Sequence, residues 1–252
     1  MSEERIWTAA LLVIGDEILS GRTQDKNVAQ VATWLNGQGI RLSEVRIVPD
    51  VEARIAAAVN ELRAAYDYLF TTGGIGPTHD DISVDSVAAA LGVPVVIHPK
   101  ARKILEDYYA TRGGLNGARL RMARVPEGAE LIENRESGAP GVKIGNIYMM
   151  AGVPSIAARM LQALDGRLEG GKPVVSVTVG AYAAESEVAD LLRATEAAHQ
   201  GVAIGSYPFF RDGRHGANFV VRSENPELVE RTAEDLAKGL TDAGIEPFPG
   251  GI

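Results

Sequence analysis

Apolar runs of strand length alternate with segments of helical periodicity in the N-terminal part of the chain. The runs 8–14, 42–48 and 68–71 predict strands, and the apolar positions of 25–35 and 51–65 recur at the spacing of amphipathic helices. An unbroken apolar run such as 8–14 is typical of a parallel strand that is buried on both faces. The order strand, helix, strand, helix, strand predicts an α/β fold with a three-layer, doubly wound, mostly parallel sheet. Ligands of such sheets bind at the carboxyl ends of the strands.

The next part of the chain continues this alternation less regularly. We expect a helix over 81–91, a short strand over 93–97 and a helix over 100–111. The stretch 142–150 alternates and then becomes fully apolar, which predicts either a hairpin or a returning strand, and a helix follows at 155–164.

A glycine-rich, polar stretch over 166–173 predicts a domain boundary, so we divide the chain into domains 1–167 and 168–252. The second domain has the element order strand, helix, strand, strand, helix, strand, which predicts a smaller ferredoxin-like α+β domain. We expect the aromatic residues of 204–210 to fill its core between sheet and helices, and we favour this interpretation over a base-stacking platform.

Charge and composition exclude several classes of protein. The formal net charge is -8, so the overall balance predicts no nucleic-acid partner, although a local basic patch is compatible with it. The chain has no cysteine, which excludes disulfides and thiolate metal sites and fits a cytoplasmic protein. No stretch approaches the roughly 20 apolar residues of a membrane span, so we expect no membrane partner. The histidines show no ligand pattern, and we expect no permanent zinc, haem or flavin.

The strand over 68–71 runs into a loop with three glycines in four positions, followed by proline and threonine: Thr72, Gly73, Gly74, Ile75, Gly76, Pro77 and Thr78. Glycine allows positive φ and a close approach of the backbone, so successive N–H groups can point at an anion. The helix that starts just downstream adds its positive end. This loop therefore predicts a phosphate-binding site.

Acidic residues follow the ends of the same three predicted strands: Asp16 and Glu17, Asp50, and Asp80 and Asp81. Because the carboxyl ends of parallel strands meet at one edge of a sheet, these carboxylates are expected to face one crevice. Clustered carboxylates repel one another unless a cation lies between them. A hard divalent ion that bridges them to the phosphates of a ligand would compensate both charges.

Some of these residues also have purely structural interpretations. An Asp after a strand is commonly part of a turn, and Asp81 or Ser83 is a plausible N-cap of the helix that follows. Arg119, Arg121 and Arg124 could grip a phosphate, but we favour a solvated basic edge. The glycine loop is different, because it matches neither a Walker loop nor the dinucleotide fingerprint and has more glycines than a tight turn needs.

The segments 71–81 and 15–21 together resemble the molybdopterin-binding (MoaB/Mog-type, MoCF) domain. More specifically, they resemble the N-terminal part of competence/damage-inducible protein A (CinA) and the matching domain of FAD synthase. The similarity extends through the second domain, where it includes 205–208. The resemblance implies a MoaB/Mog-like fold for the first domain.

The resemblance also implies roles for single residues. Asp50 and Asp81 match two aspartates that are essential in the pterin adenylyltransferases, and Asp80 matches the double aspartate of the CinA and FAD-synthase branch. We therefore expect catalytic roles for these three. We expect metal contacts from Asp16, Glu17, Asp50, Asp80 and Asp81. We expect ligand contacts from Gly15, Thr72, Gly73, Gly74, Gly76, Pro77, Thr78, Ser83 and Gly152.

The activity implied by the CinA and FAD-synthase branch is metal-dependent hydrolysis of a nucleotide pyrophosphate such as ADP-ribose or FAD, with magnesium or cobalt and possibly potassium. The alternatives are molybdopterin adenylyl transfer and non-catalytic binding of a pterin or nucleotide. One departure bears on this choice, because Ala151 replaces the first proline of the usual Pro-Gly-x-Pro. Neither the deamidase domain of full-length CinA nor the transferase domain of FAD synthase matches this sequence. Relatives commonly form dimers or trimers, which implies a homo-oligomer.

Overall fold

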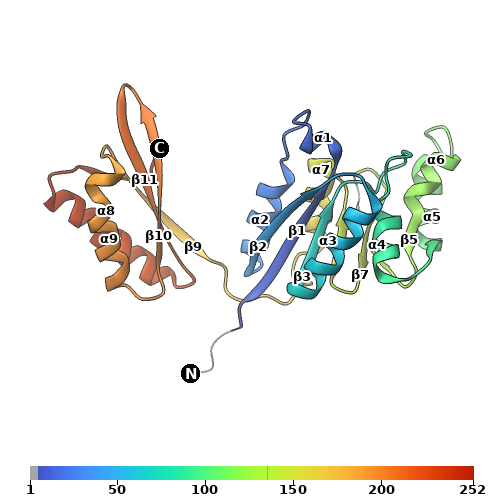
Figure 1. The fold of residues 1–252 in the computed structure, drawn as a ribbon, viewed down its shortest axis with the longest axis horizontal. Coiled ribbons are helices and arrows are strands. Elements are labelled where there is room, and N and C mark those ends of the chain that lie inside the picture. The colour runs from blue at the N-terminus through green and yellow to red at the C-terminus, as the bar shows by residue number, and fades with distance from the viewer. Residues whose placement is uncertain (1–4, 135) are drawn as a thin grey trace. The chain divides into compact units, whose positions relative to one another are not determined.

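The structure, a computed structural model, describes residues 5–134 and 136–252 and divides into two compact units, Met1–Gly171 and Lys172–Ile252 (Figure 1). The division falls a few residues after the predicted boundary at 167/168. Among the described residues, no helix is long and apolar enough to cross a bilayer.

The first unit is built on a six-stranded sheet of order β2-β1-β3-β8-β7-β6. The strands are β1 (Trp7–Ile14), β2 (Ile40–Val48), β3 (Tyr68–Thr72), β6 (Glu130–Ile132), β7 (Gly141–Ile144) and β8 (Ile147–Met150). β1 is parallel to both β2 and β3, and β8 is parallel to β3, whereas β7 pairs antiparallel with β8 and β6. The predicted mostly parallel, doubly wound sheet is confirmed, and the stretch 142–150 is both a hairpin and a returning strand.

Helices cover both faces of this sheet (Figure 1). Ala10 and Leu12 of β1 pack in a core with α3 (Glu52–Ala65) and α4 (Ser83–Leu91). The alternate residues Leu11 and Val13 pack on the other face, with α2 (Asn27–Gly37) and α7 (Pro154–Gln162). Both faces of β1 are thus buried, which is the physical reason for its unbroken apolar run.

A lobe between α4 and β6 departs from the expected alternation. β4 (Val95–Ile97) lies within the predicted strand 93–97, but among the described residues it pairs only with β5 (Arg124–Pro126), in a separate antiparallel sheet. α5 (Pro99–Tyr109), α6 (Gly117–Leu120) and the short 3₁₀ turn Arg121–Ala123 complete the lobe. Its small core consists of Ala101, Leu105 and Ala123 with their neighbours.

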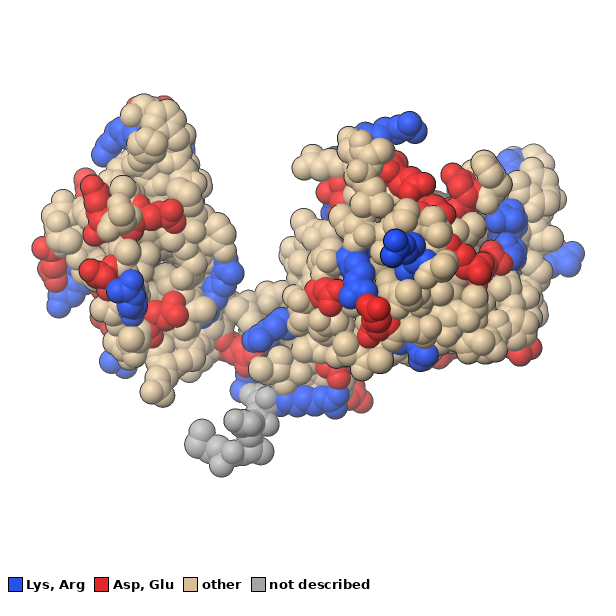
Figure 2. All heavy atoms as spheres, viewed as in Figure 1, with Lys and Arg blue, Asp and Glu red and all other residues tan. Residues whose placement is uncertain are grey.

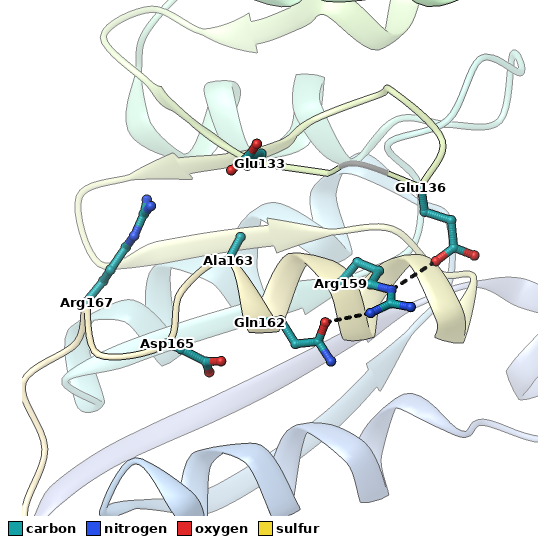
Figure 3. Close-up of a pocket in the computed structure, with 7 residues that line it drawn as sticks. All are labelled: Glu133, Glu136, Arg159, Gln162, Ala163, Asp165 and Arg167. Carbon is teal, nitrogen blue, oxygen red and sulfur yellow. Dashed lines mark hydrogen bonds and ion pairs between the residues drawn. The ribbon is translucent and has the colours of Figure 1, made fainter.

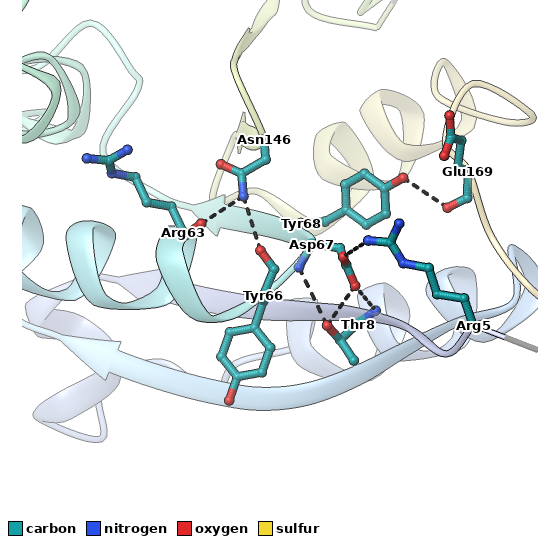
Figure 4. Close-up of polar contacts among 8 residues, drawn as sticks. All are labelled: Arg5, Thr8, Arg63, Tyr66, Asp67, Tyr68, Asn146 and Glu169. Carbon is teal, nitrogen blue, oxygen red and sulfur yellow. Dashed lines mark hydrogen bonds and ion pairs between the residues drawn. The ribbon is translucent and has the colours of Figure 1, made fainter. Parts of the chain in front are cut away.

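Polar contacts tie together the loops at the amino ends of the parallel strands, opposite the predicted site (Figure 4). The carboxylate of Asp67 accepts hydrogen bonds from the N–H and the hydroxyl of Thr8, at 2.8 and 2.9 Å. The side chain of Asn146 donates to the carbonyl oxygens of Arg63 and Tyr66, at 3.0 and 3.1 Å. These contacts join the starts of β1, β3 and β8.

The second unit has a four-stranded sheet of order β10-β11-β9-β12. Its elements are β9 (Val175–Ala181), α8 (Glu185–Ala198), β10 (Ala203–Arg211), β11 (Arg214–Ser223), α9 (Pro226–Asp242) and β12 (Pro247–Pro249). Val179, Phe219 and Val221 pack with apolar residues of α8 and α9 in one core, so both helices cover the same face of the sheet (Figure 1). The ferredoxin-like order is confirmed.

The aromatic residues of 204–210 do not fill that core, so this part of the prediction was wrong. Tyr207 is 45% exposed and Phe210 65% exposed. Tyr207 and Phe209 alternate with Ile204, which faces the helices, and so point to the uncovered side of the sheet.

Candidate active site

A cavity of about 730 Å³ lies at the carboxyl ends of the parallel strands. Gly15 after β1, Asp50 after β2, Gly73 after β3 and Ala151 after β8 all line it. The fold therefore brings these loops to one edge, as expected for a doubly wound sheet. Figure 2 shows acidic side chains gathered at this end of the first unit.

The glycine loop after β3 forms one wall of the cavity. Gly73 and Gly74 have φ angles of 98° and 65°, which residues with a side chain rarely adopt. A Cβ on Gly73 would lie 2.2 Å from the carbonyl oxygen of Ile14, and one on Gly74 would lie 2.2 Å from Oγ of Ser83. Both the backbone conformation and the close packing therefore require glycine at these two positions.

The loop leaves backbone N–H groups free for a ligand. Within the described residues, the N–H groups of Gly74, Ile75 and Gly76 have no protein acceptor. The N–H of Gly73 instead donates to the carbonyl oxygen of Met150 at 3.2 Å. The N–H groups that the glycine loop offers to a ligand are thus those of 74–76. Gly73 forms the turn that orients them.

Asp81 is held toward the glycine loop and does not cap α4. Ile82 occupies the N-cap position and makes no side-chain cap hydrogen bond. The carboxylate of Asp81 accepts from the N–H of Thr78 at 2.7 Å and from the Thr78 hydroxyl, and it lies beside Gly76. The N-cap interpretation was therefore wrong for both candidates, since Ser83 is the first residue of α4 and the carboxylate of Asp81 lines the cavity.

Asp50 lines the cavity and lies near other carboxylates. Its carboxylate accepts from the N–H of Asp16 at 2.9 Å. Burial raises the pKa of Asp50 above its usual range, and the negative charges of Asp16, Glu17 and Asp80 raise it further, against the opposite effect of that hydrogen bond. The Thr78 side chain, in contrast, holds the pKa of Asp80 below its usual range by hydrogen bonding. The site therefore combines carboxylates of unlike acidity.

Most of the predicted site residues line the cavity: Gly15, Glu17, Asp50, Gly73, Gly74, Gly76, Pro77, Asp80, Asp81 and Gly152. Four lie outside its lining. Asp16 contributes its N–H to Asp50, and Thr78 holds Asp81. Ser83 is fully buried behind the loop, where its hydroxyl donates to the carbonyl oxygen of Gly73 at 2.9 Å. Thr72 is buried beside a side pocket of about 70 Å³, and its hydroxyl has no partner among the described atoms.

The carboxylates fit a metal ion only in combination with a ligand. Within residues 5–134 and 136–252, no group of three or more Asp, Glu or His side chains is gathered as a metal site. The mutual repulsion that raises the pKa of Asp50 nevertheless favours a cation beside it. Mg²⁺ is commonly held by one or two carboxylates together with substrate phosphates and water, and this donor set suits that mode.

The cavity also has an apolar part of its lining, which was not predicted. Tyr109 and Met122 come from the lobe after α4, and Ile156 and Met160 come from α7. A further unpredicted residue is Asn27, which is 4% exposed and donates to the carbonyl oxygen of Gly152 at 2.8 Å. The cavity thus offers backbone amides, carboxylates and apolar side chains in one lining.

Two of the three arginines expected at a solvated basic edge lie behind the glycine loop instead. Arg121 and Arg124 line a small pocket together with Gly74 and Gly76. Arg121 donates to the carbonyl oxygen of Asp81 at 3.3 Å, and Arg124 forms an ion pair with Asp85.

A second cavity, of about 750 Å³, lies beside the C-terminal half of α7 (Figure 3). Arg159 in its wall already pairs with Glu136 at 3.5 Å and donates to Gln162 at 3.0 Å. Asp165 accepts from the indole N–H of Trp34 at 2.7 Å. Because Arg159 and Asp165 already have partners within the protein, we assign no ligand to this cavity.

Two known protein families match this sequence, one in each unit of the fold. Residues 10–169 match the model of the family described as "Probable molybdopterin binding domain". The chain belongs to this family. Residues 173–248 match a second family, described as "FAD synthase, middle domain". The order of the two matches follows the two units of the fold.

Individual relatives align with most of this chain or with part of it. A protein of Aeropyrum pernix is 33% identical and is covered over 96% of its length by 98% of this chain. A CinA-like protein of Desulfovibrio desulfuricans is 31% identical, and the aligned region spans 93% of this chain but only 56% of that relative. The crystal structure of CinA from Thermoplasma acidophilum superposes with a TM-score of 0.60 at 29% identity, over 64% of this chain and 98% of that one. The chain therefore spans about half the length of the CinA-like relative.

Proposed function

We propose that the chain is a metal-dependent pyrophosphohydrolase of a nucleotide diphosphate such as ADP-ribose or FAD. One observation carries the proposal: a single cavity joins the free N–H groups of 74–76, the carboxylates of Asp50, Asp80 and Asp81, and an apolar wall. A nucleotide diphosphate has the same division into an anionic part and a planar ring. The N–H groups bind the diphosphate, and the wall with Tyr109 and Met122 receives a ring.

The carboxylates have two different roles, metal binding and proton transfer. Asp80 and Asp81, with Glu17, face the charged end of the ligand and would hold a magnesium or cobalt ion together with its phosphates. Such an ion, when bound, offsets the negative charge that develops on the phosphates. Asp50 has a raised pKa and serves as the base that orients a water molecule and accepts its proton.

The reaction follows from this placement. The water oxygen forms a bond to one phosphorus atom, and the bond from that phosphorus to the bridging oxygen breaks. The water proton passes to Asp50, and the other phosphate leaves with the bridging oxygen. ADP-ribose would thereby give AMP and ribose 5-phosphate. The loop amides, fixed in place before the reaction, stabilise the additional charge on phosphorus-bound oxygens.

The test compares two Asp→Asn variants. Asp81→Asn should abolish turnover of ADP-ribose and FAD, measured by separation of the nucleotide products in the presence of Mg²⁺ or Co²⁺, without loss of the fold. Asp165→Asn is the matched control, because Asp165 lines the cavity of Figure 3 and accepts one hydrogen bond there. This control should keep its activity. Retained turnover in Asp81→Asn would remove the assignment of the site.

The family match favours a second candidate, adenylyl transfer to molybdopterin at the same cavity, because its model describes a molybdopterin-binding domain. Here the N–H groups of 74–76 would bind the phosphates of ATP. Transfer of AMP to molybdopterin with no hydrolysis of ADP-ribose or FAD would establish this activity. Ligand-induced thermal stabilisation without any turnover would instead establish a binding protein.

A further inference from the structure

The uncovered face of the second unit's sheet is aromatic. Strand register places Tyr207 and Phe209 of β10 on this face, opposite Asn218 and Gly216 of β11. Phe248 of β12 lies on the same face, opposite Gly180 of β9. The other face carries the core with α8 and α9, so neither of these two helices covers the rings.

Close packing holds the rings against the sheet. Ring atoms of Phe209 occupy the space above Gly216, where a Cβ would come within 2.3 Å of them, and those of Phe248 do so above Gly180, at 2.1 Å. Tyr182 lies between the two, with ring centroids 5.6 Å from Phe209 and 5.7 Å from Phe248. The glycines thus allow a row of aromatic rings close to the strands.

The same face is positively charged. Arg214 stacks over the ring of Tyr182 at 3.9 Å, and Arg222 donates to the hydroxyl of Tyr207. Neither arginine is paired with a carboxylate in the part of the chain that the structure describes. Arg211 shares this face and has a long contact of 3.7 Å to Asp212 in the adjoining turn.

Negative charge in this unit lies elsewhere. No residue of β9, β10, β11 or β12 is acidic. The acidic residues lie on α8 and α9, apart from Asp212, Glu224 and Glu246 in connecting segments. Figure 2 shows acidic side chains over the helices of this unit. The net charge of -8 is a sum over the whole chain and therefore does not indicate that one face of this unit is basic.

We propose that this face binds single-stranded nucleic acid. Its rings present π-faces on which bases stack, and its arginines complement phosphates. Arg214 and Arg222 lie at opposite ends of β11, which places them roughly 27 Å apart along an extended strand. A row of cations of that length suits a chain of several nucleotides better than one small nucleotide. The expectation of no nucleic-acid partner came from the overall charge alone.

The test uses the full chain and fluorescein-labelled oligo-dT and oligo-rU of about 12 nucleotides, followed by fluorescence anisotropy. Phe209→Ala should weaken binding roughly tenfold or more, because one stacking surface is lost. Phe210→Ala is the matched control, since neighbouring residues of a strand point to opposite faces. This control should leave binding unchanged.

The arginines are tested by salt dependence, which needs no change to the core. Arg214→Gln and Arg222→Gln should each lower the slope of log K against log salt by roughly 0.7 between about 50 and 200 mM. Arg231→Gln on α9 should leave the slope unchanged. Asp81→Asn should not alter oligonucleotide binding, so failure of this proposal and failure of the proposed function are separate results.

Three outcomes would overturn the proposal: no binding at about 100 µM protein, equal effects of Phe209→Ala and Phe210→Ala, or stronger binding of a duplex of the same length. Sedimentation provides a fourth. If Phe209→Ala or Arg214→Gln dissociates an oligomer, the face is covered by a second copy of the chain, and the nucleic-acid proposal fails.

Discussion

The carboxylate of Asp50 accepts a hydrogen bond from the backbone N–H of Asp16, 2.9 Å away, and so links the carboxyl ends of β2 and β1. This contact holds a carboxylate in a place that is unfavourable for its charge. Burial and the neighbouring Asp16, Glu17 and Asp80 raise the pKa of Asp50. The protein without ligand therefore keeps a destabilised anion at the cavity, as catalytic sites commonly do.

Asp50→Asn should make the chain more stable at neutral pH and inactive. A carboxyl group whose pKa is raised on folding stabilises the folded state only while it is protonated, and this contribution is lost as pH rises through the raised pKa. The stability gain of Asp50→Asn, measured by urea unfolding, should therefore be present at pH 8 and vanish at pH values below the pKa. The turnover of the parent should fall as pH decreases through the same range. A gain that does not depend on pH would contradict this account.

Gly74→Ala should abolish ligand binding, whereas Gly92→Ala should not. Both glycines have φ near 65°, at 65° and 68°, so alanine at either position bears the same backbone cost of about 1–2 kcal/mol. A Cβ on Gly92 meets no described atom within 4 Å, whereas one on Gly74 meets Oγ of Ser83 at 2.2 Å. The extra loss of stability in Gly74→Ala therefore measures displacement of the loop.

Thermal unfolding and ligand-induced shifts in Tm with ADP-ribose would report both effects. Equal destabilisation of Gly74→Ala and Gly92→Ala, together with an equal shift in Tm on adding ligand, would show that the loop tolerates the side chain.

Arg121 is expected to position the glycine loop. Its guanidinium donates to the carbonyl oxygen of Asp81 at 3.3 Å, and its Nε is buried without a partner among the described atoms. Arg121→Lys keeps the positive charge but loses the planar set of guanidinium N–H donors. We therefore expect kcat/KM to fall about tenfold. Arg102 on α5 forms an exposed ion pair with Glu106, and Arg102→Lys should leave kcat/KM unchanged.

In the proposed function the loop amides both bind the diphosphate and stabilise its developing charge, so a positioning role predicts that Arg121→Lys raises KM as well as lowering kcat. Unfolding temperature should change little, since the backbone contact of Arg121 is a single long hydrogen bond. A fall in kcat at unchanged KM would place Arg121 in the chemical step instead.

The sequence predicts the acidic and amide half of the cavity because that half follows from local patterns. Asp50 and the loop 73–76 each come directly after a buried strand, and parallel pairing brings such ends to one edge. The apolar half follows from no such rule. Tyr109 and Met122 belong to a lobe that reaches the cavity through tertiary packing, and ordinary apolar residues carry no motif that marks them as ligand contacts.

The second unit shows a related limit. Alternation along β10 places Tyr207 and Phe209 on one face of the sheet and Ile204 on the other. The alternation alone does not determine which of these two faces the helices cover. Packing of α8 and α9 against Val179 and Phe219 decides that question. Tyr207 and Phe209 are therefore predicted as core residues by the sequence but lie on the open face in the structure.

Asp67 provides the last prediction, at the end of the sheet opposite the cavity (Figure 4). Burial opposes its ionisation, but hydrogen bonds from the N–H and hydroxyl of Thr8 and from Arg5 together lower its pKa. A lowered pKa stabilises the fold above the unfolded-state value of about 3.9, and this stability is lost as pH falls through the folded-state pKa.

Asp67→Asn should therefore cost about 1–3 kcal/mol at pH 7, because an amide cannot accept all of these hydrogen bonds and brings donors of its own toward Thr8. Asp107→Asn is the control, since Asp107 forms an exposed ion pair with Lys103 and should cost less than about 1 kcal/mol. Urea unfolding of both variants at neutral pH and near pH 3 would measure the difference. If the cost of Asp67→Asn were the same at both pH values, packing rather than the ionised carboxylate would join the starts of β1 and β3.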